Sequence, residues 1–471
     1  MPVERSLEVL LELPASPKVV AVARAIGSRT RGKSDNAKSV LSLFRDRLGT
    51  LPTTFEVIPS LIAPSRGGED ADKVFLARGR IDLSDLDRLV KRAAGKVFSN
   101  PRVSWAQSCP AGHPVASLEE VSALLKLDQL HGAPAPSSHL EPMVGDGVAI
   151  AIVDKGINVE HLGTQLPHHP PHQVRFKSKY SWTPDPCHDF PVGKAPVGHG
   201  TQCAFAALLS APKATLLDHA MRRKREDIGD GSHIDDTLAA ATQSYKHLTT
   251  LLTEISPEVR GFRSLVVNNS WAVTDPATDF PATHEGRYHD NPNHPFNKSV
   301  TALAAAGADI VFAAGNCGAE CPHDGCALDV EGFDVINGAN SHPQALCVGG
   351  VRKDDAVIGY SSRGPGTLTR EKPDLVTYTH FLGSEAEGSG FVDTGTSTAC
   401  AVAAGIVAAL RSRYPYEPGN PKRSPQAIRD FLLQCARPPN AQANGWAEDY
   451  GFGILRGDCF AHADDVLGPA G

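Results

Sequence analysis

The stretch VDTGTSTACAVAAG, residues 392–405, joins a Gly-Thr-Ser turn to a row of small residues. Ser397 lies where the turn would become a helix over Thr398–Arg411. A helix N-terminus supplies free backbone N–H groups and a partial positive charge, which would stabilise a serine alkoxide and an oxyanion. Taken alone, the serine would be an N-cap and the small residues would indicate tight helix packing. A nucleophile would also need a base, a carboxylate and hydrogen-bond donors elsewhere in the chain.

Short apolar runs recur after residue 146, with helix-like segments between several of them. They cover residues 147–154, 214–220, 264–270, 308–316 and 345–351. Because buried parallel strands are continuous apolar runs, residues 146–471 are predicted to form an α/β domain with a mainly parallel sheet. Chemistry gathers at the carboxyl ends of the strands in such sheets. The polar residues near these ends are therefore the candidates for a site.

Three polar residues are candidates for the site, two of them at the ends of these runs. Asp154 ends the first run, His199 begins an apolar helix-like segment between two glycines, and Asn316 follows Gly315. Each has an ordinary structural alternative, namely a turn-opening Asp, a helix-capping His and a Gly-Asn turn. Together with Ser397 they supply an orienting carboxylate, a base, an oxyanion donor and a nucleophile, in the chain order that subtilisin uses.

These motifs resemble those of the subtilisin-like serine proteases, the subtilases of peptidase family S8. The resemblance covers roughly residues 145–465. The main matching segments are Gly198-His199-Gly200-Thr201, Ala313-Ala314-Gly315-Asn316 and Gly395-Thr396-Ser397-Thr398-Ala399. The weaker matches are Asn269-Ser270-Trp271, Ser361-Ser362-Arg363-Gly364-Pro365 and Lys372-Pro373-Asp374-Leu375.

The resemblance implies a three-layer α/β/α domain that hydrolyses peptide bonds through an acyl-enzyme intermediate. Its triad would be Asp154, His199 and Ser397, with Asn316 in the oxyanion hole. An extended polypeptide substrate would lie against the expected substrate-binding residues, which are Ser270, Trp271, Ala272, Ala314 and Gly315. Two alternatives stay open: a catalytically impaired protein-binding module on this fold, and a triad esterase or peptide transferase.

Residues 1–107 follow a different pattern. Strand-like segments at 6–13, 55–62, 73–81 and 96–106, with helical spacing over 35–48 and after Ser84, predict a ferredoxin-like α+β domain of order β-α-β-β-α-β. This region resembles the inhibitor I9-like propeptide domain of subtilases. We therefore expect it to dock over the cleft as an intramolecular inhibitor, followed by a proline-rich linker at 108–145 with one helical piece around Leu118–Leu130.

Two departures from the family motifs concern residues beside the expected triad. The family usually has Ser or Thr after the aspartate, where this chain has Lys155, a cation expected to favour the ionised Asp154 if the side chains approach. A proline usual in the serine motif is absent at Cys400-Ala401. We interpret Cys203 and Cys400 as small buried hydrophobes. Because no triad member is missing, we expect an active enzyme.

The loop after Asn316 contains Cys317, Cys321 and Cys326, with His323 and Asp324 among them. A metal site, a disulfide and free thiols are the alternatives; the spacing matches no zinc pattern, so free thiols are favoured. Residues 274–297 suggest a long surface loop near the substrate cleft, where calcium is an alternative without a defined ligand spacing. No cofactor is expected to be required.

The bulk properties argue against some partners and locations. A formal net charge of −7 gives no reason to expect nucleic acid or an anionic membrane as a partner. No run of about eighteen apolar residues predicts a membrane span, and the N-terminus does not have the pattern of a secretory signal. Together with ten dispersed cysteines, these features predict a cytoplasmic protein with mostly reduced thiols.

Overall fold

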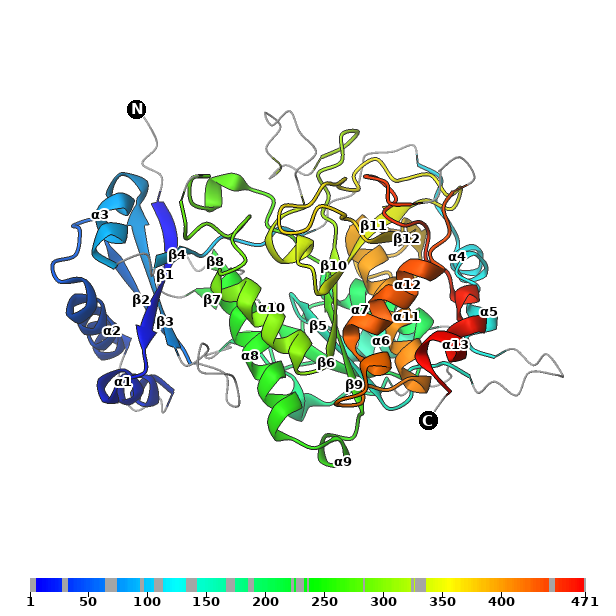
Figure 1. The fold of residues 1–471 in the computed structure, drawn as a ribbon, viewed down its shortest axis with the longest axis horizontal. Helices are drawn as coiled ribbons and strands as arrows, with labels where there is room; N and C mark the ends of the chain where they lie inside the picture. Colours follow the sequence, from blue (N-terminus) through cyan, green and yellow to red (C-terminus); the bar gives the residue numbers. More distant parts are fainter. Residues whose placement is uncertain are drawn as a thin grey trace.

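The structure is a computed structural model in which a small N-terminal unit lies beside a larger α/β unit (Figure 1). It describes all residues except 1–5, 28–32, 64–73, 94–96, 106–112, 133–141, 167–173, 185–189, 222–223, 226–232, 235–236, 283, 323–325, 327–335, 440–444 and 470–471. The expected boundary at 107 and the start of the expected linker at 108 therefore lie outside the described residues.

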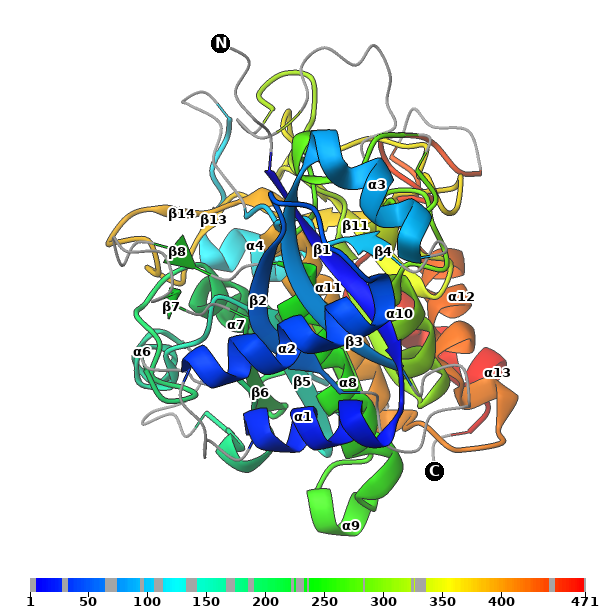
Figure 2. The same ribbon diagram turned by 90° about the vertical axis from the view of Figure 1, so that its left-hand side faces the viewer.

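The N-terminal unit is a four-stranded antiparallel sheet with helices on one face (Figure 2). The strand order is β2-β3-β1-β4. The strands are β1 (Ser6–Pro14), β2 (Glu56–Ile62), β3 (Val74–Asp82) and β4 (Val97–Ser99), and the helices are α1 (Pro17–Gly27), α2 (Lys33–Leu48) and α3 (Leu83–Ala93). The expected ferredoxin-like order is present with one additional helix, α1, between β1 and β2. Ser84, after which the helix was expected to begin, is already the second residue of α3.

Alternation along β1 explains how the small sheet is covered on both faces. Leu7, Val9 and Leu11 pack with the helices in one core cluster. Leu10, on the opposite face, packs with Ala239 of the large unit. Side chains of a strand point alternately to the two faces, so an apolar strand of this kind needs a partner on each side.

The large unit is built on a six-stranded sheet in which every pairing is parallel, as predicted. The strand order is β12-β11-β10-β9-β5-β6. The strands are β5 (Val148–Asp154), β6 (Thr215–Ala220), β9 (Ser264–Asn269), β10 (Ala308–Ala313), β11 (Ala345–Val351) and β12 (Leu375–Tyr378). The apolar runs of the sequence correspond to five of these strands.

Helices cover both faces of this sheet and complete the predicted three layers (Figure 1). One face packs against α7 (His199–Ser210), α11 (Gly395–Arg413) and α12 (Pro425–Cys435), and the other against α8 (Leu238–Glu254) and α10 (Pro295–Ala305). Val148, Ile150 and Ile152 belong to the first core, whereas the intervening Ala149 and Ala151 belong to the second. A central strand buried on both faces is therefore apolar at every position.

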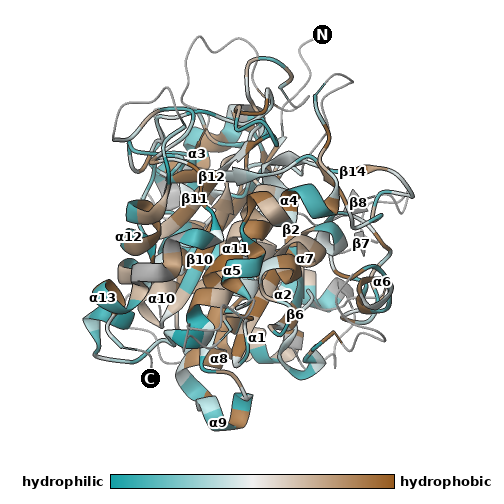
Figure 3. Ribbon diagram, turned by 90° about the vertical axis from the view of Figure 1, so that its right-hand side faces the viewer, coloured by the Kyte–Doolittle hydropathy of each residue, from teal (hydrophilic) through white to brown (hydrophobic). Residues whose placement is uncertain are grey.

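The small residues of α11 serve close packing. A Cβ added at Gly405 would lie 2.1 Å from the carbonyl oxygen of Ala207 in α7, so only glycine fits there. By length and composition α11 could cross a membrane, but 94% of its apolar window is buried inside the protein. In Figure 3 hydrophobic residues dominate this central helix, as expected for the core of the large unit.

Shorter elements connect this framework. Helices are α4 (Leu118–Leu124), α5 (Leu127–Leu130), α6 (Val159–Gln165), α9 (Pro257–Arg260) and α13 (Ala463–Leu467), and strands are β7 (Lys224–Arg225), β8 (His233–Ile234), β13 (Phe381–Leu382) and β14 (Val392–Asp393). The single helical piece expected around Leu118–Leu130 is divided into α4 and α5, because Lys126 between them has a left-handed backbone.

Polar contacts join the two units at the N-termini of two helices. The side-chain oxygen of Asn100 accepts a hydrogen bond from the Ala239 backbone N–H of α8 at 2.8 Å. His294, which caps α10, contacts the Ser99 carbonyl through Nε2 at 2.9 Å. Phe280 is part of the N-terminal core cluster. Segment 274–297 therefore contacts the N-terminal unit through Phe280 and His294, which its interpretation as a surface loop did not foresee. Its first residue, Thr274, does line the cleft.

Candidate active site

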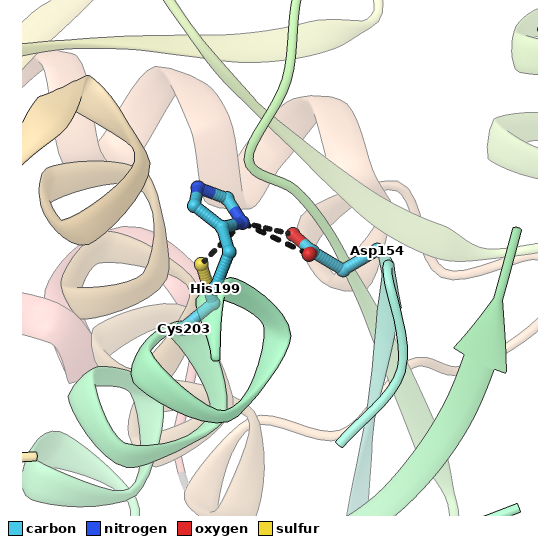
Figure 4. Close-up of side chains that lie close together, drawn as sticks. All are labelled: Asp154, His199 and Cys203. Atoms are coloured by element: carbon cyan, nitrogen blue, oxygen red, sulfur yellow. Dashed lines mark hydrogen bonds and ion pairs between the residues drawn. The ribbon is translucent and has the colours of Figure 1, made fainter. Parts of the chain in front are cut away.

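Asp154 and His199 form a buried pair at the carboxyl end of the sheet (Figure 4). Asp154 is the last residue of β5 and His199 the first of α7. Nδ1 of the histidine lies 2.9 and 3.0 Å from the two carboxylate oxygens. A Cβ at Gly200 would lie 2.3 Å from the Gly156 carbonyl oxygen, so the glycine after the histidine allows α7 to approach this turn.

Ser397 lies in the first turn of α11, which begins at Gly395 and not after the serine as expected. Its hydroxyl donates to the carbonyl oxygen of Ser270 at 3.0 Å. Nε2 of His199 is buried and, among the described residues, has no hydrogen-bond partner. The side chain that could receive the serine proton is therefore available for a new hydrogen bond, while the serine hydroxyl is bonded elsewhere.

The amide of Asn316 is oriented by the residue that precedes the serine. Oδ1 of Asn316 accepts hydrogen bonds from the backbone N–H of Thr396 at 2.9 Å and from its hydroxyl at 3.0 Å. The backbone donor identifies the oxygen of the amide, so the N–H groups of Asn316 are on its other side. Gly315, which precedes the asparagine, has a φ of 103° that favours glycine.

One narrow depression contains most of the predicted site residues. Its lining consists of Ser104, Trp105, Ser270, Trp271, Ala272, Thr274, Ala313, Gly315, Asn316, Thr396 and Ser397. Ala314 does not line it: this residue is fully buried and its N–H bonds to the Val348 carbonyl, so a direct contact with substrate is not available in this structure. Trp271 is also buried, and its indole donates to the Val153 carbonyl at 3.0 Å.

The chain's own segment after the N-terminal unit forms one side of this depression. Ser104 pairs antiparallel with Ala272: the Ser104 N–H donates to the Ala272 carbonyl at 2.6 Å, and the Ala272 N–H donates back at 3.2 Å. The Trp105 ring lies edge-on to the His199 ring, with centroids 5.5 Å apart. Lys155 places its ammonium 5.1 Å from the centre of the same indole. Sequence reasoning noted Lys155 as a departure but did not find this contact.

Two buried thiols lie close to these groups. Sγ of Cys203 is 3.9 Å from Nδ1 of His199 (Figure 4), and Sγ of Cys400 is 3.3 Å from the Asn268 side-chain oxygen. Burial raises the pKa of Cys203 well above its ordinary value and that of Cys400 to about 12. Both thiols are protonated near neutral pH and are poor nucleophiles. They are free and buried, as predicted.

Asp154, His199 and Cys203 also bring three potential metal ligands within 4.8 Å of one another. The carboxylate and the imidazole already bond to each other, and a thiol must lose its proton to bind a metal well. Their geometry is that of a hydrogen-bonded pair with a neutral thiol beside it.

The loop after Asn316 is closed by a disulfide between Cys317 and Cys326, and Cys321 is disulfide-bonded as well. The expectation of free thiols was therefore wrong. These cysteines are also not available as thiolate ligands for the alternative metal site, since disulfide sulfurs carry no thiolate charge. His323 and Asp324 lie outside the described residues. The Cys317 N–H donates to Ser362 Oγ at 3.0 Å, which holds the loop beside Asn316.

The parallel sheet and its helices thus hold an Asp–His pair, a serine in the first turn of a helix and an asparagine beside it. The subtilase family model (Peptidase_S8) matches residues 145–453, so the chain belongs to the subtilase family. It is 26% identical over 344 residues to the subtilisin-like protease PopC of Myxococcus xanthus, covering 71% of this chain and 65% of PopC.

A second relative is the subtilisin-like protease SBT6.1 of Arabidopsis thaliana, 25% identical over 348 residues, covering 72% of this chain and 27% of that protein. The chain thus spans less than two thirds of the length of either relative. Fervidolysin from Fervidobacterium pennivorans, a keratinolytic enzyme related to subtilisin, has a similar structure with a TM-score of 0.51 and 15% identity, covering 96% of this chain and 60% of fervidolysin. At this identity the similarity concerns the fold.

Proposed function

We propose that the chain is a serine endopeptidase that hydrolyses peptide bonds through an acyl-enzyme intermediate on Ser397. The buried Asp154–His199 pair carries the proposal, because the His199 ring lies against Trp105, which lines the same cleft as Ser397 and Asn316. Rotation about the Cα–Cβ bond of Ser397 would turn its hydroxyl from the Ser270 carbonyl towards Nε2 of His199, which has no hydrogen-bond partner in the described part of the chain. His199 would then accept the proton as Ser397 attacks the substrate carbonyl carbon.

The remaining steps follow from the same groups. The N–H groups of Asn316 and the backbone N–H of Ser397 would bind the oxyanion of the tetrahedral intermediate. Its collapse breaks the C–N bond, and the leaving amine takes the proton from His199. Water then attacks the acyl ester by the same route and releases Ser397. Asp154 would orient the imidazole and stabilise its charged form throughout.

The N-terminal unit would regulate this site as an intramolecular inhibitor. Support comes from Ser104, whose backbone pairs with Ala272 at the place where an extended substrate strand would pair. A polypeptide substrate would have to displace this segment before it reached Ser397. Docking of the unit through Asn100 and His294 would hold the segment in the cleft.

A fluorophosphonate probe tests the proposal, because it phosphonylates an activated serine. We expect an adduct on Ser397 of the full chain by intact mass and peptide mapping, faster labelling of Trp105→Ala, and no adduct on Ser397→Ala or His199→Ala. Absence of the adduct from both wild type and Trp105→Ala, with both folded, would reject the endopeptidase.

A catalytically silent peptide-binding module is the second candidate. It is favoured by one observation, the hydrogen bond of the Ser397 hydroxyl to the Ser270 carbonyl in place of His199. The two candidates differ in the fluorophosphonate result. Among active enzymes, product masses from peptide substrates with a competing amine separate hydrolysis from transfer: a hydrolase gives free carboxyl products, and a transferase gives the amides.

A further inference from the structure

The indole of Trp105 contacts two side chains at the cleft, the ammonium of Lys155 and the imidazole ring of His199. The Lys155 ammonium lies 5.1 Å from the centre of the ring, and the His199 ring lies at 5.5 Å with an interplanar angle of 66°. The indole Nε1 is buried and has no hydrogen-bond partner among the described residues. The ring, and not a hydrogen bond, is therefore what this part of the cleft contacts.

We propose that Lys155 and His199 form an aromatic subsite, which selects substrates with an aromatic side chain at the position that Trp105 occupies. The inference rests on the proposed function of the cleft and names a feature of its substrates. Lys155 is the specificity-determining residue, and His199 is the second wall of the subsite.

The backbone pairing of Ser104 supports the inference that a substrate side chain can take the place of Trp105. Ser104 and Ala272 exchange both backbone hydrogen bonds, and the ring of the next residue, Trp105, lies against His199. A substrate strand bound in the same register would present its corresponding side chain to the same two groups. Ser397 lines the same depression as Trp105, so the subsite is next to the candidate nucleophile.

The charge of Lys155 explains the selection. An ammonium is attracted to the negative face of an aromatic ring, most strongly to that of Trp. An Arg or Lys side chain at this position would meet a like charge, and an aliphatic side chain would gain only apolar burial. A Glu side chain could pair with the ammonium, so it is the competing class of ligand to test. Lys155 is half-buried beside Asp154, where such contacts are screened less than at the surface.

Binding to a catalytically disabled chain tests the subsite without requiring hydrolysis. The protein is the full chain with Ser397→Ala and Trp105→Ala. The second change removes the ring that fills the subsite, so that an added peptide competes only with the backbone pairing of the chain's own Ser104. Fluorescently labelled peptides of sequence Val-Ser-X-Ala-Gln, taken from residues 103–107 with X as Trp, Ala, Lys or Glu, are titrated by fluorescence polarisation. Thermal unfolding first establishes that each variant is folded.

We expect the Trp peptide to bind about ten-fold more tightly than the Ala peptide, because a large aromatic surface is buried. Adding Lys155→Met should reduce this preference about five-fold, whereas Lys155→Arg should retain it since a guanidinium also binds ring faces. Lys179→Met is the matched control: it removes an equal charge from an exposed lysine that faces Tyr180. It should leave the preference unchanged.

Four outcomes would each overturn the subsite. The Trp and Ala peptides could bind equally, the Glu peptide could bind more tightly than the Trp peptide, or no peptide could bind. The fourth is a Trp preference that Lys155→Met leaves unchanged. These outcomes are independent of the proposed chemistry. A Trp preference without any fluorophosphonate adduct on the active chain would keep the subsite and reject the endopeptidase. An adduct without a Trp preference would do the reverse.

Discussion

Ser397 and Ser270 bond to each other in both directions. The Ser397 hydroxyl donates to the Ser270 carbonyl at 3.0 Å, and the Ser270 hydroxyl donates to the Ser397 carbonyl at 2.9 Å. Ser270 directly follows β9, and Ser397 lies in the first turn of α11. The reciprocal pair thus joins the carboxyl end of the central strand β9 to the helix that contains the candidate nucleophile.

Replacing Ser270 by Ala should destabilise this junction. The substitution removes the hydroxyl that donates to the Ser397 carbonyl and that accepts from the buried Asn268 Nδ2 at 3.0 Å, and the free energy of unfolding should fall by about 1–3 kcal/mol. Urea unfolding measures the change. Ser389→Ala, at an exposed serine, is the control and should stay within about 0.5 kcal/mol of wild type. Equal stabilities of the two variants would contradict the role of the pair.

Replacing Asn316 by Ala should lower kcat on a peptide substrate by about 10²–10³ with little change in KM, because the amide would bind charge that develops in the transition state. Asn316→Asp keeps the shape but not the N–H donors, so it should lose at least as much. Steady-state kinetics provides both constants. A loss confined to KM in either variant would show that Asn316 binds substrate without stabilising an oxyanion.

Thr396→Val should have a smaller effect on kcat than Asn316→Ala. It removes the hydroxyl that donates to Asn316 Oδ1 at 3.0 Å, while the backbone N–H of the same residue still donates at 2.9 Å. The asparagine would be held less firmly but would keep its donors. A kcat equal to that of wild type would mean that the backbone donor alone orients the amide.

The contact between the two units should weaken in mild acid through His294. Burial lowers the pKa of His294 from 6.5 to about 4. Nδ1 caps α10 by accepting the Phe296 N–H, and a protonated Nδ1 could not accept this bond. Between these values the unfolded chain binds a proton that the folded chain does not, so stability falls as the pH falls from 6.5 towards 4.

His294→Gln keeps a donor and an acceptor but does not titrate, and its stability should fall less over this range. Denaturant unfolding at pH 4 and pH 7 makes the comparison. Asp279, which lies near His294, contributes little to the stability change between pH 7 and pH 4. Burial raises its pKa, but the hydrogen bond and charge of His289 outweigh this and lower the pKa to about 2, so the folded protein protonates this group only below the range tested. Parallel pH profiles for wild type and variant would exclude His294 as the cause.

Removing the Cys317–Cys326 disulfide should destabilise the loop beside Asn316. In the chain-entropy description a bridge of this span contributes about 2–4 kcal/mol to the free energy of unfolding. A Cys317→Ala/Cys326→Ala chain should therefore unfold at lower urea concentration under non-reducing conditions. An unchanged midpoint would contradict this. The bridge favours an oxidising environment, whereas the dispersed cysteines predicted the cytoplasm, and the location stays a prediction.

Local patterns in the sequence determined the sheet and the order of the site residues. Continuous apolar runs predict buried parallel strands because each residue of such a strand meets a helix layer. Asp154 follows from this rule, since it ends β5. The motifs around His199, Asn316 and Ser397 identified their elements, although α11 begins before Ser397 because Gly395, with a φ of 85°, turns the chain into the helix.

Only the tertiary structure decided which distant residues meet. Lys155 and Trp105 are 50 positions apart, and their contact depends on how the N-terminal unit docks against α8 and α10. The tertiary structure also decided three other features: the burial of Ala314, the Cys317–Cys326 bridge and the place of Phe280 in the N-terminal core. The physical reason is that periodicity and turn chemistry act over a few residues, whereas docking sums many weak contacts between separate units.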